Sequence, residues 1–336
     1  MRDVAIVSYA RQVVPHSDND EVEMLAPVIT EALASAQLDR REVGITVSGS
    51  CDYLGGRPFS FVMALDAVGA WPPIRESHVE MDGAWALYEA WVALQHGDID
   101  VALVYAFGRS TQGNLHQVLG TQLDPYTVAP LGVDVRHLAA LQARAMIDAG
   151  KCTERDLASV AASHRGGDVD ELLKAPYVAS PLRAHDCAPA ADGVAAVVLV
   201  AGDKARRSSA RPAWIRGIDH RIDAHALGTR DLLRAPSAEL AAQKAGVGKG
   251  PVDVAELDAP FSHQELLLRG ALGLDSKVKI NPSGGPLTGW PYIVSGLLRL
   301  GEAARRVQTG EAKRAVAHAT SGPCLQQNLV CVLEAE

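Results

Sequence analysis

Apolar, mostly β-branched runs that alternate with helical patterns constrain the fold of this chain more than any other feature. Few polar residues interrupt these runs, which predicts strands that are covered on both faces. Strands that alternate with helices favour βαβ units and a parallel or mixed sheet. In the first series the runs lie at 3–10, 44–50, 100–108 and 194–202, and the helical patterns lie at 21–38, 83–97 and 138–150.

A second series follows the basic stretch 205–212, whose Ser and Pro content is typical of a linker. Its elements have roughly the order and lengths of the first series, which indicates a duplication at the level of the fold. We therefore predict an N-terminal half at 1–205, with a shortened excursion at about 109–190, and a C-terminal half at 206–336. The second half should have strands at 213–222, 253–260, 314–320 and 328–334, and helices at 237–246, 263–273 and 292–310.

Charge and cysteine content exclude several classes of protein. The net charge is −8 and the arginines are spread along the chain, so we expect no nucleic-acid-binding surface. The five cysteines are scattered without C-x-x-C spacing, so we expect neither a disulfide framework nor a metal site. The apolar runs are too short to span a membrane, and the N-terminus lacks the pattern of a signal peptide. We expect a cytoplasmic protein.

Five motifs, in this order along nearly the whole chain, resemble the thiolase superfamily. They are DVAIVSYAR at 3–11, SPLRAHDCAPAADGVAAVVLV at 180–200, ELDAPFSHQE at 256–265, KINPSGGPLTGWPYIVSG at 279–296 and NLVCVLE at 328–334. The chain is most similar to the sterol-carrier-type thiolases and to actinobacterial lipid-transfer proteins, the subgroup of the steroid side-chain aldolases.

This resemblance implies an α/β thiolase fold, with two similar βαβαβαββ halves in a five-layer αβαβα arrangement. It also implies a homodimer, or a heterodimer with another thiolase-like chain. Coenzyme A thioesters are the expected substrate or ligand, and no covalently bound cofactor is expected.

The strand–turn–helix HVEMDGAWALYEAW at 78–91 corresponds to the segment where thiolases carry their nucleophilic cysteine. The resemblance places Glu80 at the cysteine position. A carboxylate cannot form the acyl-thioester intermediate, because that step needs a thiolate. Two interpretations of Glu80 and Asp82 stay open. They are acidic residues that stabilise a helix N-terminus, or Glu80 is a catalytic base and Asp82 binds substrate.

The motif GWPYIVSG lies where the family carries a Gly-His-Pro motif, and Trp290 takes the place of the histidine. An indole donates one hydrogen bond but accepts no proton, so we assign Trp290 to substrate binding. Tyr292 is the nearest group that donates a proton or, with a lowered pKa, abstracts one. The alternative is that Tyr292 only packs on the following helix. The preceding loop keeps Asn281, Gly284 and Gly285, which are expected to shape a substrate pocket.

The motif ELDAPFSHQE corresponds to a family block in which an asparagine holds a catalytic water. Gln264 replaces that asparagine as an amide donor, and Asp258 stands where the aldolases are thought to carry a tyrosine. His263 is a candidate base or, alternatively, a cap or surface residue. In the C-terminal loop, Cys324 lies past the expected proton-shuttle position, and we interpret Cys324 and Cys51 as buried, inert thiols.

Thiolysis and Claisen condensation need the nucleophile, the activating histidine and the proton shuttle, which are replaced or displaced in this chain. Two other functions remain compatible with the residues that are present. The first is a subunit of a retro-aldolase that cleaves a β-hydroxyacyl-CoA in steroid or lipid side-chain degradation. The resemblance implies an OB-fold, zinc-ribbon partner that holds the acyl-CoA. The second is a non-catalytic subunit that pairs with an active paralogue, or that binds acyl-CoA or lipid without turnover.

Overall fold

The computed structural model describes residues 1–69 and 73–336. The N-terminal half contains β1 (Val4–Val14), α1 (Glu21–Ser35), β2 (Ile45–Gly49), α2 (Asp52–Gly55), α3 (Leu65–Val68), β3 (Glu76–Val79), α4 (Gly83–His96), β4 (Val101–Arg109), α5 (Leu115–Gly120), α6 (Val135–Asp148), α7 (Glu154–Arg165), α8 (Val169–Leu172), β5 (Tyr177–Ala179), β6 (Leu182–Arg183) and β7 (Asp192–Ala201). After α9 (Gly202–Ser208) come β8 (Ala213–Ile222), α10 (Pro236–Ala245), β9 (Val254–Leu257), α11 (Ser262–Ala271), β10 (Lys279–Ile280), α12 (Ser295–Gln308), β11 (Arg314–Ser321) and β12 (Gln327–Glu334).

The two halves of the chain repeat one strand order. In the ten-stranded sheet the N-terminal strands run β1-β7-β4-β2-β3 and the C-terminal strands run β8-β12-β11-β9-β10. In each half, therefore, the first strand lies beside the last, followed by the fourth, second and third. The halves join where β1 pairs with β8 in antiparallel orientation. The duplication predicted from element order is confirmed.

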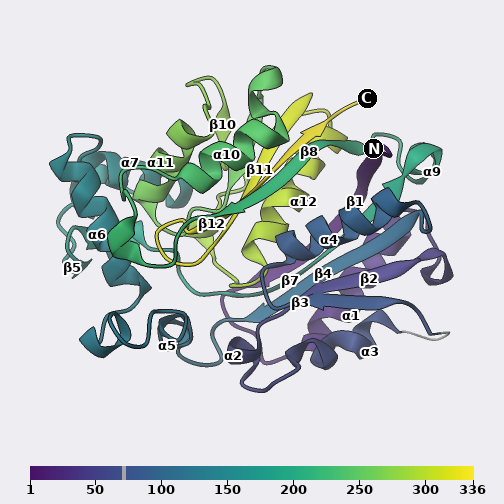
Figure 1. The fold of residues 1–336 in the computed structure, drawn as a ribbon, viewed down its shortest axis with the longest axis horizontal. Coiled ribbons are helices and arrows are strands. Elements are labelled where there is room, and N and C mark those ends of the chain that lie inside the picture. The colour runs from purple at the N-terminus through teal and green to yellow at the C-terminus, as the bar shows by residue number, and fades with distance from the viewer. Residues whose placement is uncertain (70–72) are drawn as a thin grey trace.

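Helices α4 and α12 form the middle of five layers. Each packs on strands of the sheet, and the two helices also contact each other. The outer helices α10 and α11 lie on one side of the molecule, and α1 and α3 lie on the opposite side (Figure 1). Separate apolar clusters fill the space around the middle helices, under α1, and under α10 and α11. The predicted αβαβα arrangement is confirmed.

The apolar runs of the sequence form the strands that were predicted from them. The run at 194–202 becomes β7, which is buried at every position from Asp192 to Ala201. The helix predicted at 292–310 begins only at Ser295, because Ile293 has a φ of 76° and cannot continue a right-handed helix. The prediction of a linker at 205–212 was wrong in part, since α9 continues through Ser208. The half boundary at 205 and 206 stays a prediction.

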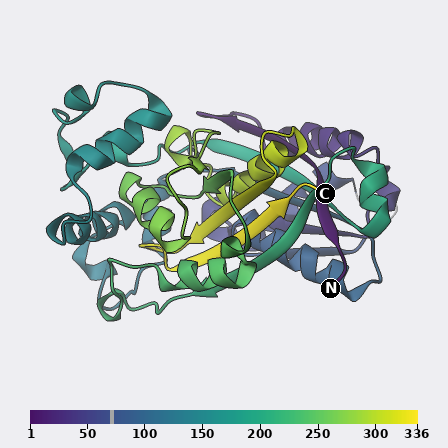
Figure 2. The same cartoon turned by 90° about the horizontal axis from the view of Figure 1, so that it is seen from above.

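The segment between β4 and β7 forms a lobe at one end of the molecule, where α6, α7 and β5 project from the layered core (Figures 1 and 2). A small apolar cluster with Leu123, Leu138 and Cys324 connects this lobe to the C-terminal half. The excursion therefore contributes packing surface next to the loop between β11 and β12.

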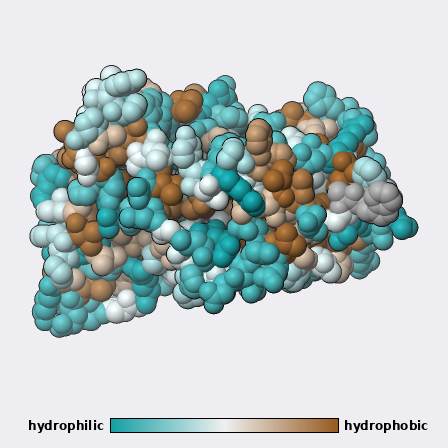
Figure 3. Space-filling view, turned by 90° about the horizontal axis from the view of Figure 1, so that it is seen from below, coloured by the Kyte–Doolittle hydropathy of each residue, from teal (hydrophilic) through white to brown (hydrophobic). Residues whose placement is uncertain are grey.

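The face shown in Figure 3 mixes hydrophilic and apolar residues, with the apolar patches separated by hydrophilic ones. Within residues 1–69 and 73–336, every helix is too short or too polar to cross a membrane.

Candidate functional site

The N-termini of the two central helices meet at Asp82. This residue is the N-cap of α4, and its Oδ1 accepts hydrogen bonds from the backbone N–H groups of Ala84 (2.8 Å) and Leu297 (3.0 Å). Its Oδ2 accepts from the N–H of Gly296 (2.9 Å). The N-cap position of α12 is Val294, which offers no side-chain cap. Asp82 therefore satisfies the first turns of both helices.

Asp82 is 4% exposed, and burial raises its pKa to about 8, with a further rise from the nearby charge of Asp258. Its three N–H partners oppose this rise because they stabilise the carboxylate. All three of these hydrogen bonds run to backbone groups at the two helix N-termini, which agrees with the interpretation of Asp82 as a residue that stabilises a helix N-terminus. Substrate binding by Asp82 stays an untested prediction.

Glu80 lies in the turn between β3 and α4, which contains only Glu80, Met81 and Asp82 and so offers no Ser or Cys. Glu80 Oε1 accepts a hydrogen bond from the backbone N–H of Asp52 at 2.5 Å. Burial raises the pKa of Glu80 above the usual range of a glutamate. Burial also raises the pKa of the neighbouring Cys51 thiol to about 11, and the charge of Glu80 adds to this. Glu80, whose carboxylate is more basic than that of an ordinary glutamate, thus lies beside the protonated thiol of Cys51.

The backbone before α12 is strained at Ile293, and hydrogen bonds and close packing hold the backbone of Tyr292 in place. A positive φ is unusual for a β-branched residue such as Ile293. In this conformation the carbonyl of Ile293 accepts a hydrogen bond from the N–H of Gly83 (2.9 Å), and the N–H of Tyr292 donates to Ser110 Oγ (2.9 Å). A Cβ at Gly108 would lie 2.0 Å from the carbonyl oxygen of Tyr292, so only glycine fits there.

Tyr292 lines a cavity of about 40 Å³ at the junction of the excursion with the C-terminal half. Its Oη accepts a hydrogen bond from Gln122 Nε2 at 2.6 Å, and its ring meets the Trp290 ring edge-on at 5.6 Å. Burial raises the pKa of Tyr292, so the phenol stays protonated and acts as a donor rather than a base. The other described lining residues are Leu119, Val135, Pro260, Phe261, Gln264, Thr320, Ser321, Gly322, Pro323, Cys324 and Leu325.

Gln264 and His263 lie side by side at the start of α11 but face different surroundings. Gln264 is 2% exposed and lines the cavity, and its Oε1 has no hydrogen-bond partner in the described part of the chain. Its Nε2 donates to Gln142 Oε1 at 3.2 Å. His263 is fully buried against the same Gln142 Oε1, and burial lowers its pKa to about 3. His263 is therefore not a surface residue. The predicted role of His263 as a base stays untested.

Asn281, Gly284 and Gly285 shape their own loop rather than the wall of the cavity. Asn281 Oδ1 accepts from the N–H of Leu257 (2.6 Å), and its Nδ2 donates to Glu265 (3.0 Å). Gly285 has a φ of 61°, and a Cβ there would lie 2.8 Å from the Asn281 amide. These contacts account for Asn281 and Gly285 in the loop without any contact to a ligand. Substrate binding by these three residues stays an untested prediction.

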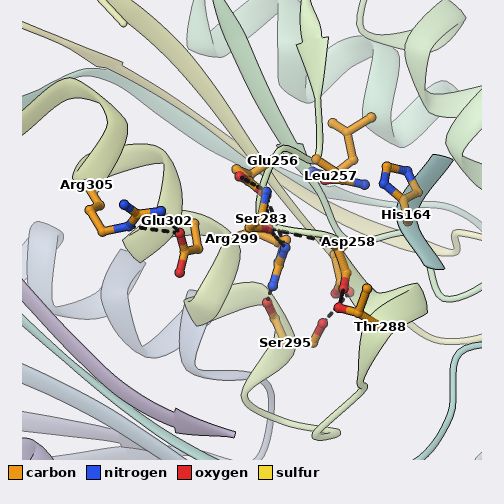
Figure 4. A network of polar contacts seen from close by, with 12 residues as sticks. His164, Glu256, Leu257, Asp258, Ser283, Thr288, Ser295, Arg299, Glu302 and Arg305 are labelled. Carbon is orange, nitrogen blue, oxygen red and sulfur yellow. Dashed lines mark hydrogen bonds and ion pairs between the residues drawn. The ribbon is translucent and has the colours of Figure 1, made fainter. Parts of the chain in front are cut away.

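Asp258 takes part in a buried polar network around α12 (Figure 4). Its Oδ1 accepts from Ser295 Oγ at 2.6 Å, and burial raises its pKa. Nearby, Arg299 donates to Glu256 Oε2 (3.0 Å) and to Ser283 Oγ (2.6 Å). Among the described residues, Asp258 lies outside the cavity lining. These contacts give Asp258 a structural role, and the catalytic role predicted for it stays untested.

The loop between β11 and β12 closes one side of the cavity. Cys324 and Leu325 have positive φ angles of 54° and 56°, which are strained for residues other than glycine. The Cys324 thiol donates to the carbonyl of Leu138 at 3.3 Å, and burial raises its pKa to about 12. A thiol with this pKa is not an activated nucleophile, which agrees with the interpretation of Cys324 as inert.

The structure thus brings Trp290, Tyr292 and Gln264 together at one cavity and places Glu80 beside it. Sequence reasoning missed Gln122, which lies in a segment with little apolar periodicity and offers no motif. It also interpreted Cys51 only as an inert thiol and did not predict that this residue packs in one apolar cluster with Tyr292. Neither contact has a signal in the local sequence, because both join segments that are far apart in the chain.

No family model matches the chain. Among characterised proteins, it is 26% identical to an acetyl-CoA acetyltransferase of Methanothermobacter thermautotrophicus, over 96% of this chain and 95% of that protein. It is 25% identical to the beta-ketothiolase BktB of Cupriavidus necator, over 88% of this chain and 90% of that protein.

Solved structures give the same fold. Human mitochondrial 3-ketoacyl-CoA thiolase superposes with a TM-score of 0.81, at 16% identity, over 99% of both chains. The Ltp2-ChsH2(DUF35) aldolase also superposes with a TM-score of 0.81, at 19% identity, over 99% of this chain and 98% of that chain. A structure of the human thiolase in complex with CoA has a TM-score of 0.79, at 15% identity, over 100% of this chain and 98% of that chain.

The chain has the thiolase fold, and over most of its length its sequence is similar to an acetyl-CoA acetyltransferase and a beta-ketothiolase.

Proposed function

We propose that the chain is the thiolase-like subunit of a retro-aldolase that cleaves a β-hydroxyacyl-CoA during steroid or lipid side-chain degradation. One observation carries this proposal. The turn at the start of α4 offers two carboxylates and no nucleophile, while the adjoining cavity presents a protonated tyrosine and an amide. Retro-aldol cleavage needs a base and hydrogen-bond donors but no covalent intermediate.

Each group has a defined part in this reaction. Glu80, whose pKa is raised, accepts the proton of the β-hydroxyl group. The bond between Cα and Cβ then breaks, the carbonyl compound leaves, and the electron pair moves into the thioester enolate. Tyr292 donates a hydrogen bond to the enolate oxygen, and Gln264 lines the same cavity. The proton taken up by Glu80 is then given to the enolate carbon, which regenerates the base and releases the shortened acyl-CoA.

In this proposal Glu80 and Tyr292 act on one substrate. Burial raises the pKa of Tyr292, and the charge of Glu80 adds to this rise, which supports placing the two groups in one site. The base comes from the turn after β3, and the donor comes from the loop before α12. Trp290 packs against Tyr292 and, in this proposal, takes the place of a catalytic histidine without moving protons.

The proposed assembly includes a second thiolase-like chain and an OB-fold, zinc-ribbon protein that holds the acyl-CoA. The Ltp2-ChsH2(DUF35) aldolase supports this assignment, because it is a complex whose thiolase-like fold matches this chain. The bound CoA of the human thiolase supports a CoA thioester as the ligand. A cavity of about 40 Å³ holds a few waters rather than an acyl chain, so its walls must move when substrate binds.

The same small cavity favours a second candidate function, that of an accessory subunit which completes the dimer of an active paralogue. In that case Tyr292 and Glu80 take no part in turnover. The two functions differ in what happens when these side chains are changed.

The test is to express the chain with the proteins encoded beside it and to supply a steroid or fatty β-hydroxyacyl-CoA. For a catalytic subunit, Tyr292→Phe and Glu80→Gln each lower kcat by about 100-fold or more, since general acid–base groups contribute at least that much. Tyr177→Phe is the matched control, because Tyr177 is 48% exposed on β5, away from the cavity. Unchanged cleavage by both variants would assign the accessory role instead.

A further inference from the structure

A hydrogen bond joins Gln122 to Tyr292 across 170 positions of the sequence. Gln122 follows α5 in the segment between β4 and α6, and its N–H donates to the carbonyl of Leu119 at 3.2 Å. Leu119, Gln122 and Tyr292 all line the cavity. The excursion, which the sequence marks only by its lack of periodicity, therefore contributes a polar group directly to the candidate site.

The direction of this hydrogen bond decides where the phenol proton of Tyr292 can point. A phenol has one proton to donate and lone pairs that accept. Gln122 Nε2 donates to the oxygen at 2.6 Å, so the proton is directed elsewhere. Gln264 also lines the cavity, and its buried Oε1 has no partner among the described residues. The cavity thus contains a free O–H donor and a free amide acceptor.

Gln122 and the titratable groups around Tyr292 have opposite effects on the pKa of Tyr292. Cys51, Glu80 and Asp82 are the titratable groups that act on Tyr292, and each raises its pKa in addition to burial. The hydrogen bond from Gln122, in contrast, lowers the pKa of Tyr292. A donor at this position stabilises the phenolate that forms whenever the proton is given to a ligand.

We propose that Gln122 is a positioning residue that turns the hydroxyl proton of Tyr292 into the cavity and supports the phenolate when that proton moves. The catalytic consequence of this inference rests on the proposed function, whereas the contact between the two side chains does not. The excursion segment is thereby part of the acid–base machinery as well as a wall of the cavity.

The experiment uses two variants that keep the length of the side chain. Gln122→Met removes the donor, and Gln122→Glu replaces it with an acceptor that draws the phenol proton away from the cavity. Gln117→Leu is the matched control, because Gln117 is exposed on the adjacent α5. Tyr292 is observed directly by NMR of protein labelled with ¹³C at tyrosine Cζ, and its resonance is assigned by its loss in Tyr292→Phe.

Both Gln122 variants should shift the Cζ resonance of Tyr292, with Gln122→Glu having the larger effect, while Gln117→Leu leaves the resonance in place. In the cleaving complex, kcat should fall about tenfold for Gln122→Met and further for Gln122→Glu, with KM nearly constant, as expected for one lost hydrogen bond to a group that becomes charged. A Cζ resonance unchanged by both variants overturns the inference, whether or not the complex is active. A shifted resonance in a complex without cleavage retains the inference and refutes the proposed function.

Discussion

Helices α4 and α12 hold equivalent places in the two halves of the fold, yet they are built differently. Helix α4 follows a three-residue turn and is capped by Asp82 of its own half. Helix α12 follows a long loop with a strained Ile293, and it depends on the same Asp82 for its first turn. The carboxyl group of Asp82 therefore joins the two halves at the N-termini of both central helices.

The two helices also differ in what they bury. The buried residues of α4 are glycine, alanine, leucine and tryptophan, whereas α12 buries Ser295, Arg299 and Glu302. Duplicated halves can thus keep one topology while one helix serves as apolar packing and the other organises a polar network. The comparison shows that the scaffold constrains strand order far more strongly than it constrains the chemistry at the helix N-termini.

The largest effect on stability is expected for Asp82→Ala. This change leaves three buried N–H groups without an acceptor, at a cost of about 4 kcal/mol in the free energy of unfolding. Asp20→Ala is the control, since Asp20 caps only α1 in an exposed capping box, and its loss costs about 1 kcal/mol. Urea unfolding of the two variants measures the difference. Equal losses would contradict a shared cap.

Arg299→Met tests the polar interior of α12. It leaves the fully buried Glu256 without its cation, and we expect a loss of about 3 kcal/mol at neutral pH. The pKa of Glu256 is already raised by burial, so the variant should regain stability as the pH falls and the carboxyl is protonated. Arg305→Met, on the same helix, should cost less, because Glu302 keeps its ion pair with Arg11 at 2.9 Å. A loss independent of pH would argue that Arg299 contributes only packing.

A smaller, pH-dependent effect is expected from His263 in the outer layer of the C-terminal half. Its pKa is lowered to about 3 by burial, so the folded protein keeps it neutral while the unfolded chain binds a proton below about pH 6.5. Stability is therefore lost as the pH falls from about 6.5 toward 3, by about 2 kcal/mol at pH 5. His263→Leu should remove this component, as seen by comparing urea unfolding at pH 7 and pH 5. The same pH dependence in variant and parent would show that His263 is protonated in the folded state.

The sequence predicts the layered core well because long apolar runs carry their own signal. The run that becomes β7 and the helical pattern that becomes α4 needed no tertiary information. The site is harder to predict because its contacts join distant segments. Asp82 appears as an ordinary cap in the sequence, and only the fold shows that it also holds α12. Gln122 reaches Tyr292 from a segment without periodicity.

The same limit applies to His263, which sequence reasoning left between a base and a surface residue. It is buried and forms a hydrogen bond with Gln142 of α6, and the local sequence around each residue gives no sign of this contact. Trp290, Tyr292 and Gln264, by contrast, were found through motifs, since each replaces or neighbours a residue in a recognisable block. Motifs locate a site, whereas burial and hydrogen-bond direction decide what each of its groups can do.

The central claim is that the thiolase scaffold here supports carbon–carbon cleavage without an acyl-enzyme. The most direct measurement is the product balance when the assembled complex is given a β-hydroxyacyl-CoA, combined with the intact mass of this chain during turnover. The account predicts equal amounts of carbonyl compound and shortened acyl-CoA, without consumption of free CoA and without added mass on the chain. CoA-dependent thiolysis of a 3-ketoacyl-CoA, with an acyl group on Cys51 or Cys324, would contradict it.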